Sequence, residues 1–270
     1  MDARVLPQQV FTRQLGEGPR EVLALHCTLA HSGAWRGLVQ QLGQEARFTT
    51  FDMLSHGRSP DWDGQGDIQD RIVEIAETLL TRRMDLIGHS FGATVALRLA
   101  AAYPERVRSV TMVEPVYFCF AEEVAPELLA AHEADAAPFS EPLARGEYET
   151  GARLFNEMWG GAGPGWDEMP EAARAGMIRS IRMVPACRPS LYDDPAGMLA
   201  PGRLGRIAAP ALLLRGSDSH PVTAAINAGI ARRLPDAEDV VIAGAGHMLP
   251  ITHPVEMAAH LRALFARAGE

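Results

Sequence analysis

The chain has 270 residues, of which 47% are hydrophobic, and its 25 Lys and Arg against 34 Asp and Glu give a net charge of −9 with histidine neutral. This composition is typical of a globular protein of one or two domains, and it excludes disordered, collagen-like and disulfide-scaffold proteins. An acidic chain without basic clusters is a poor ligand for nucleic acid or an anionic membrane, so we expect neither as a partner.

The cysteines and the N-terminus bear on the cellular compartment. The three cysteines are few and odd in number, which favours a reducing compartment without structural disulfides. The first ten residues lack the apolar run of a signal peptide, and no segment approaches 18 consecutive apolar residues. We therefore expect a cytoplasmic protein without a transmembrane helix.

Short apolar runs alternate with longer helical patterns along most of the chain. The runs that predict strands are residues 22–25, 48–52, 85–88, 107–113, 211–214 and 240–242. The patterns that predict helices are residues 34–42, 68–80, 93–102, 224–234 and 255–266. Such alternation predicts an α/β fold, with a mostly parallel sheet and helices on both faces. Ligands of such sheets bind beyond the carboxyl ends of the strands.

One segment, residues 116–201, interrupts this alternation with helical pieces, several prolines and a stretch rich in Gly and Trp. A second independent domain is one interpretation. We favour an insertion that caps the sheet, because the alternation resumes at Pro210 and needs the earlier strands to complete one sheet. The predicted organisation is a core of residues 1–115 and 202–270 with a cap of residues 116–201.

The most informative motif is Gly88-His89-Ser90-Phe91-Gly92, a G-x-S-x-G pattern. It follows the predicted strand and begins an alanine-rich helix near Ala93, which is the context of a nucleophile elbow. Such a turn presents the serine hydroxyl above the sheet, and the flanking glycines let strand and helix approach closely. The alternative interpretation is a tight turn with a serine cap. The context favours Ser90 as the nucleophile.

A serine hydroxyl needs a base held by an acid. Of the nine histidines, His247 fits best, because it lies between the last predicted strand and the last helix, at the carboxyl end of the sheet. Asp218 follows an earlier strand and gives the order Ser90, Asp218, His247, so we favour it as the acid. Glu114 is the alternative acid, because it ends the strand that follows the nucleophile helix. If the triad is wrong, Asp218 is a turn residue.

These features together resemble the α/β-hydrolase family, in its esterase and lipase-like branch. The similar segments are Leu25-His26 before a loop ending in Trp35, residues 52–59, the elbow, residues 214–218, and Gly246-His247. The resemblance implies that the backbone N–H groups of Thr28 and Phe91 stabilise an oxyanion. The chain departs from the family at Cys27, where glycine is common. Glycine tolerates dihedrals that cysteine resists, and we expect Cys27 to be a small buried residue.

The expected activity is therefore hydrolysis of a small or medium carboxylic ester, including a lactone or thioester, through an acyl-enzyme on Ser90. Two alternatives keep this fold: a C–C bond hydrolase or hydroxynitrile lyase on the same triad, and a ligand-sensing protein with slow turnover. No nucleotide fingerprint, H-E-x-x-H motif or zinc spacing is present, so we expect no cofactor and no metal. The sequence leaves the acyl and alcohol specificity and the oligomeric state open.

The cap is expected to cover the nucleophile with an apolar pocket. We predict that Phe155, Met158 and Trp159 line this pocket from the cap and that Met248 lines it from the loop of the base. The alternative is that both Trp159 and Trp166 pack only the cap's own small core.

Overall fold

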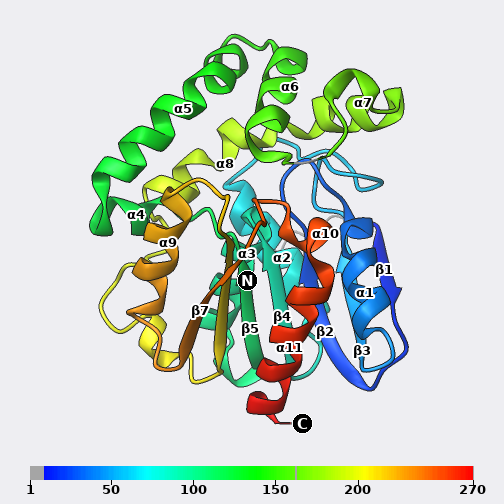
Figure 1. Cartoon of the computed structure of the whole chain (residues 1–270), viewed down its shortest axis with the longest axis vertical. Coiled ribbons are helices and arrows are strands. Elements are labelled where there is room, and N and C mark those ends of the chain that lie inside the picture. The colour runs from blue at the N-terminus through cyan, green and yellow to red at the C-terminus, as the bar shows by residue number, and fades with distance from the viewer. Residues whose placement is uncertain (1–8, 162, 270) are drawn as a thin grey trace, which may run out of the picture.

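Within residues 9–161 and 163–269, which the computed structural model describes, a seven-stranded sheet runs through the centre of the protein (Figure 1). Its strand order is β1-β3-β2-β4-β5-β6-β7. The bounds are Thr12–Leu15 for β1, Arg20–Leu25 for β2, Ala46–Phe51 for β3, Met84–His89 for β4, Val107–Val113 for β5, Ala211–Gly216 for β6 and Ala237–Ile242 for β7. Among the strands of the described residues, only the edge strand β1 pairs antiparallel, with β3, and the other pairs are parallel.

The helices follow the chain as α1 Arg36–Leu42, α2 Ile68–Leu79, α3 Phe91–Ala102, α4 Phe118–Val124, α5 Pro126–Ala144, α6 Tyr148–Trp159, α7 Glu171–Ser180, α8 Met183–Tyr192, α9 Val222–Ala231, α10 Leu249–Thr252 and α11 Pro254–Ala268. Short 3-10 helices are η1 Ser32–Trp35, η2 Pro104–Arg106, η3 Trp166–Glu168 and η4 Leu204–Arg206. One hydrophobic cluster joins α2, α3 and α9 to the sheet, and a second joins α1 and α11 to its other face. The predicted α/β class is therefore confirmed.

All six predicted strands and all five predicted helices are present, with ends that differ by a few residues. The central strands were recognisable because they are buried on both faces, as β4 is over its whole length, and so their sequences are continuous apolar runs. Strand β1 was not predicted, because its four residues, TRQL, are half-exposed and largely polar. The segment used to predict the absence of a signal peptide lies mostly in residues 1–8, outside the described residues.

The parallel register brings the carboxyl ends of the strands to one edge. Gly88 of β4 is paired with Leu25 of β2, and His89 is paired with Val113 of β5. Val113 is in turn paired with Leu214 of β6. The residues that follow these strands therefore gather above the same edge of the sheet.

The segment between β5 and β6 carries α4 to α8, and α5 to α8 lie over this edge of the sheet (Figure 1). Helix α4 instead packs beside α9, and its residues belong to the main hydrophobic cluster. A smaller cluster lies within the cap helices, around Phe139, Trp166 and Ile181. The arrangement agrees with an insertion over the sheet, while the division at residues 116 and 201 stays a prediction.

The cap is attached to the rest of the molecule by polar contacts. On α7, the guanidinium of Arg179 donates from Nε to Asp61 Oδ1 at 2.7 Å and from one terminal nitrogen to the carbonyl of Gly57 at 3.0 Å. On α8, Ser190 Oγ donates to Asp67 Oδ2 at 2.5 Å. These three hydrogen bonds join cap helices to the segment between β3 and α2.

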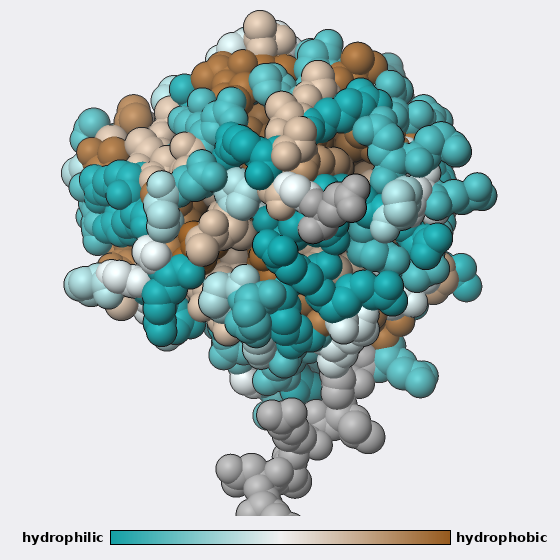
Figure 2. Space-filling model, turned by 90° about the horizontal axis from the view of Figure 1, so that it is seen from below, coloured by the Kyte–Doolittle hydropathy of each residue, from teal (hydrophilic) through white to brown (hydrophobic). Residues whose placement is uncertain are grey.

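Hydrophilic side chains predominate on the face seen from below, away from the cap (Figure 2). The larger apolar side chains that are exposed in the described residues, Val241, Ile251 and Val255, lie on β7, α10 and α11. Among the described helices, none is both long and apolar enough to cross a bilayer.

Candidate active site

Ser90 lies in a sharp turn between β4 and α3. Its backbone is left-handed, with φ 55° and ψ −117°, a conformation that costs energy for a residue with a Cβ. Both glycines of the motif are required by close approach: a Cβ at Gly88 would lie 2.2 Å from the Gly92 carbonyl oxygen, and one at Gly92 would lie 2.2 Å from the Leu25 carbonyl oxygen. The predicted elbow is therefore present.

The imidazole of His247 reaches the same cavity as Ser90 from the loop between β7 and α10. Its backbone carbonyl accepts a hydrogen bond of 2.8 Å from His89 Nε2, which connects this loop to the elbow. The indole of Trp159 in the cap lies against its ring, with centroids 4.4 Å apart. His247 is therefore held between the elbow and the cap.

The carboxylate beside His247 belongs to Glu114. Its side chain is fully buried, and Oε2 lies 3.2 Å from His247 Nδ1. The other oxygen, Oε1, accepts hydrogen bonds from the Gly216 backbone N–H at 2.7 Å and from Ser219 Oγ at 2.6 Å. Glu114 also has a left-handed backbone, with φ 50°. Buried charge needs such partners, and the loop after β6 supplies them.

Asp218, the acid that the sequence favoured, lies elsewhere. Its side chain is exposed and accepts a hydrogen bond from Ser217 Oγ, and its backbone N–H donates to the Ala245 carbonyl. The structure gives it no hydrogen bond to His247 within the described residues. The loop after β6 packs closely against the loop that carries His247, since a Cβ at Gly216 would lie 1.9 Å from the Ala245 oxygen. In the loop after β6, the side chain of Ser219 reaches Glu114, whereas the side chain of Asp218 is exposed to solvent.

Thr28 and Phe91 line the same cavity as Ser90. Within the described residues, neither of their backbone N–H groups donates a hydrogen bond to the protein. Cys27 does not have a positive φ, so the departure from glycine at this position needs no strained backbone there; Leu29 carries the left-handed conformation, with φ 63°. Burial raises the pKa of the Cys27 thiol to about 12, so the sulfur is protonated at neutral pH.

Two buried histidines fix the loop that carries Thr28. His26 Nδ1 donates to the Cys27 carbonyl, and Nε2 accepts from the Met53 N–H at 2.9 Å. His56 Nδ1 donates to the Leu54 carbonyl, and Nε2 accepts from the Leu29 N–H at 3.2 Å. Each ring can make both of its hydrogen bonds only in the neutral form, because one nitrogen donates and the other accepts. Burial is the main cause that lowers the pKa of His26 to about 3 and that of His56 to about 4.

We expect acid to destabilise the fold through these histidines. In the unfolded chain their pKa is about 6.5, so below that pH the unfolded state binds more protons than the folded state. The free energy of unfolding should fall by about 2 kcal/mol for each histidine between pH 6.5 and pH 4.5. Urea unfolding at these pH values should show a shallower pH dependence for His56→Asn than for wild type. The partly exposed His260 offers the control: an equal loss of slope in His260→Gln, or none in His56→Asn, would contradict the assignment.

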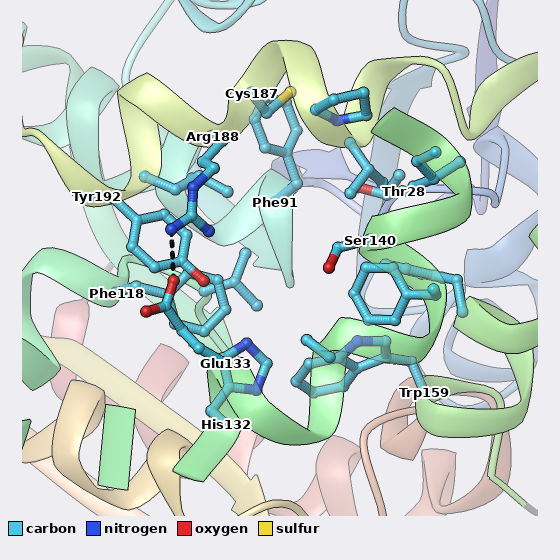
Figure 3. A pocket seen from close by; sticks show the side chains of 18 of the residues that line it. Thr28, Phe91, Phe118, His132, Glu133, Ser140, Trp159, Cys187, Arg188 and Tyr192 are labelled. Carbon is cyan, nitrogen blue, oxygen red and sulfur yellow. Dashed lines mark hydrogen bonds and ion pairs between the residues drawn. The ribbon is translucent and has the colours of Figure 1, made fainter. Parts of the chain in front are cut away.

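A cavity of about 560 Å³ lies between the sheet edge and the cap (Figure 3). Ser90 and His247 lie on its floor, and its walls come mostly from α4, α5, α6 and α8. Its lining includes Phe118, His132, Glu133, Phe155, Trp159, Cys187 and Arg188.

Two of the four predicted pocket residues line this cavity, namely Phe155 and Trp159. Met158 and Met248 do not. Met158 faces the cap's own cluster, because neighbouring positions of a helix point in different directions. Met248 precedes α10 and is absent from the lining. Trp166 belongs to the cap cluster, so the two tryptophans have different environments. The polar lining residues of α5 and α8 were not predicted.

The family model described as the alpha/beta hydrolase fold matches residues 22–254. The chain belongs to the α/β-hydrolase family. A solved structure of a thermophilic esterase from Thermogutta terrifontis has the same fold, with a TM-score of 0.69 and 19% identity over 97% of this chain and 94% of the other.

Two curated relatives span nearly the whole chain. A pimeloyl-[acyl-carrier protein] methyl ester esterase of Nitrosomonas europaea is 27% identical over 92% of this chain and 96% of its own length. The lipase LipV of Mycobacterium tuberculosis is 28% identical over 91% of this chain and 93% of its own length. This α/β-hydrolase is thus similar to enzymes named for ester hydrolysis. Among the described residues, no group of three His, Cys, Asp or Glu side chains is placed to hold a metal ion.

Proposed function

We propose that this α/β-hydrolase is a carboxylic ester hydrolase that works through an acyl-enzyme on Ser90, with His247 as base and Glu114 as acid. The observation that carries the proposal is the contact between His247 Nδ1 and the buried Glu114 Oε2, because His247 lines the same cavity as Ser90. The family and the names of the relatives support ester hydrolysis. The substrate is a small-molecule ester.

The proposed reaction begins when Ser90 Oγ attacks the ester carbonyl carbon and gives its proton to His247 Nε2. The charged imidazolium is stabilised by Glu114, which accepts the hydrogen bond from Nδ1. His247 then protonates the leaving alcohol, and the acyl group stays on Ser90. Water, deprotonated by His247, releases the acid and restores the serine. The reaction consumes one ester and one water and gives one acid and one alcohol.

The negative charge of each tetrahedral intermediate needs donors that are in place beforehand. We propose the N–H groups of Thr28 and Phe91, since both residues line the cavity that contains Ser90 and neither N–H is hydrogen-bonded within the described residues. Phe91 is also the first residue of α3, whose N-terminus favours negative charge. One such donor is worth about 3 to 4 kcal/mol of the reaction barrier.

The two cap tryptophans give a test of where the substrate binds. Trp159→Ala should change the order of preference among p-nitrophenyl esters of different acyl length, because the indole lies in the cavity wall and against the base. Trp166→Ala should instead lower the melting temperature with the order of preference unchanged, because that indole packs the cap cluster. Steady-state kinetics and thermal unfolding of both variants provide the measurement.

The opposite pattern would contradict this pocket. If Trp159→Ala were mainly destabilised and kept the wild-type order of acyl preference, the indole would serve as packing alone. A change of acyl preference in Trp166→Ala would place the acyl group inside the cap instead of beneath it.

A further inference from the structure

The cavity wall contains a polar group that the proposed reaction does not use, the imidazole of His132. It projects from α5, and in Figure 3 an edge of its ring is turned toward the cavity. The residue is only 2% exposed, and its Nδ1 has no hydrogen-bond partner within the described residues. Buried polar side chains are nearly always paired, so an unpaired one in a cavity wall requires an explanation.

Ring contacts hold His132 in place. It is stacked on Phe118, with centroids 4.6 Å apart and an interplanar angle of 14°, and it touches the indole of Trp159 at 5.5 Å. The nearby His220, at 5.2 Å, is already engaged: its Nδ1 accepts from the Val222 N–H, and its Nε2 contacts Asp135 Oδ2. The position of the imidazole is therefore fixed by packing, while its Nδ1 has no hydrogen-bond partner among the described residues.

His132 is neutral at ordinary pH. Burial, followed by the neighbouring His220, lowers the pKa of His132 to about 4. A neutral imidazole has one donor and one acceptor nitrogen, so it can bind a hydroxyl or a carbonyl oxygen but adds no charge. This suits an uncharged oxygen, because the aromatic rings of Phe155 and Trp159 line the same cavity and the charges of its lining residues Glu133 and Arg188 are paired with each other.

His132 lies close to the reacting centre, separated from His247 by the indole of Trp159. The indole of Trp159 touches both His132 and His247, with centroids 5.5 Å and 4.4 Å away. One ring therefore separates His132 from the proposed base. A substrate whose ester carbonyl lies at Ser90 and whose chain follows this wall passes the imidazole.

We propose that His132 determines specificity by hydrogen-bonding a hydroxyl or keto oxygen of the ester substrate, so that oxygen-bearing esters are preferred over alkyl esters of the same length. The proposal rests on the proposed function, because it concerns the substrate of the same site. It narrows the substrate class from carboxylic esters in general to esters with a second, uncharged oxygen function.

The kinetic experiment compares ethyl 3-hydroxyhexanoate and ethyl 5-oxohexanoate with ethyl hexanoate, and 4-hydroxybutyl hexanoate with butyl hexanoate. We expect kcat/KM of the wild type to be about 5- to 10-fold higher for at least one oxygen-bearing ester than for its alkyl partner. This ratio corresponds to the net free energy of one hydrogen bond. In His132→Phe, which keeps a ring against Phe118, this ratio should fall to about one. His260→Phe, a matched change on α11 outside the cavity, should keep the wild-type ratio.

A binding experiment separates failure of this proposal from failure of the proposed function. Calorimetry on Ser90→Ala and on Ser90→Ala with His132→Phe measures ester affinity without turnover. The second substitution should weaken binding of the preferred oxygen-bearing ester about 5- to 10-fold more than binding of its alkyl partner. Equal weakening of both esters, or a kinetic preference that survives His132→Phe, would overturn the role of His132 even if ester hydrolysis is established. The absence of all ester turnover would refute the proposed function alone.

Discussion

Ser90→Ala should lower kcat for p-nitrophenyl butyrate by about 10⁴- to 10⁶-fold while the melting temperature changes little. The serine Oγ is the atom that becomes acylated, and members of one catalytic unit are strongly non-additive, so losing this one atom removes covalent catalysis. Little packing is lost, because the residue faces the cavity floor and makes no side-chain hydrogen bond to cap its helix. Steady-state kinetics and thermal unfolding of the same preparation measure both quantities.

Cys187 provides the control, since its thiol also lines the cavity. Burial raises the pKa of this thiol far above the neutral range, so the sulfur stays protonated and is a poor nucleophile. Cys187→Ala should therefore retain turnover. A Ser90→Ala variant that kept a substantial share of wild-type activity, or a Cys187→Ala variant that lost it, would show that the nucleophile is misassigned.

Glu114→Gln should lower kcat by about 10³- to 10⁴-fold, whereas Asp218→Asn should stay within about twofold of wild type. The amide keeps the volume of the glutamate but no longer stabilises the imidazolium or fixes its tautomer. Asp218 is exposed and hydrogen-bonded to Ser217, so its amide should be tolerated. The pair of isosteric variants, assayed on one p-nitrophenyl ester, measures the difference directly.

Ser219→Ala extends this test without removing the carboxylate. It deletes one of the two donors to Glu114 Oε1 and should lower kcat about tenfold, with the Gly216 N–H still in place. This variant is informative even if Glu114→Gln folds poorly. The reverse ranking, with Asp218→Asn impaired and Glu114→Gln active, would restore the acid that the sequence favoured.

The sequence could predict the fold and the position of the elbow because both depend on local pattern. Strands buried on both faces give continuous apolar runs. The two glycines around Ser90 indicate that strand and helix approach so closely there that a side chain would not fit. The position of His247 was predictable from the order of elements along the chain. It follows the last strand, and because that strand is parallel to its neighbour, its carboxyl end lies at the same edge of the sheet as that of β4.

The carboxylate that contacts His247 could not be chosen from the sequence, because Glu114 and Asp218 both follow strands that end at that edge. The choice depends on the direction of each side chain. The left-handed backbone of Glu114 and the turn after Gly216 settle that direction, and neither is encoded by hydrophobic pattern. The order of residues along the chain therefore favoured Asp218, whose carboxylate is exposed to solvent in the loop after β6.

The pocket was predictable only in part, for a similar reason. Helices α5, α7 and α8 have weak amphipathic patterns, and α5 contains Pro138 and Pro142 within its length, so the sequence does not show which side of these helices lines the cavity. Helix α6 is clearly amphipathic, but its apolar side chains pack the cap cluster as well as the cavity wall. Trp159 and Met158 are neighbours on α6, but only the first is in the wall. His132 gave no motif at all, and its packing and unpaired nitrogen are visible only in three dimensions.

The acyl-enzyme on Ser90 is the central claim, and acid-quenched mass spectrometry tests it most directly. Enzyme mixed with p-nitrophenyl butyrate for milliseconds and then quenched should carry one butyryl group, mapped to the peptide that contains Ser90, together with a burst of p-nitrophenol that does not exceed one equivalent of enzyme. Turnover with neither a burst nor an acylated peptide, or a butyryl group mapped to another residue, would contradict the proposed mechanism.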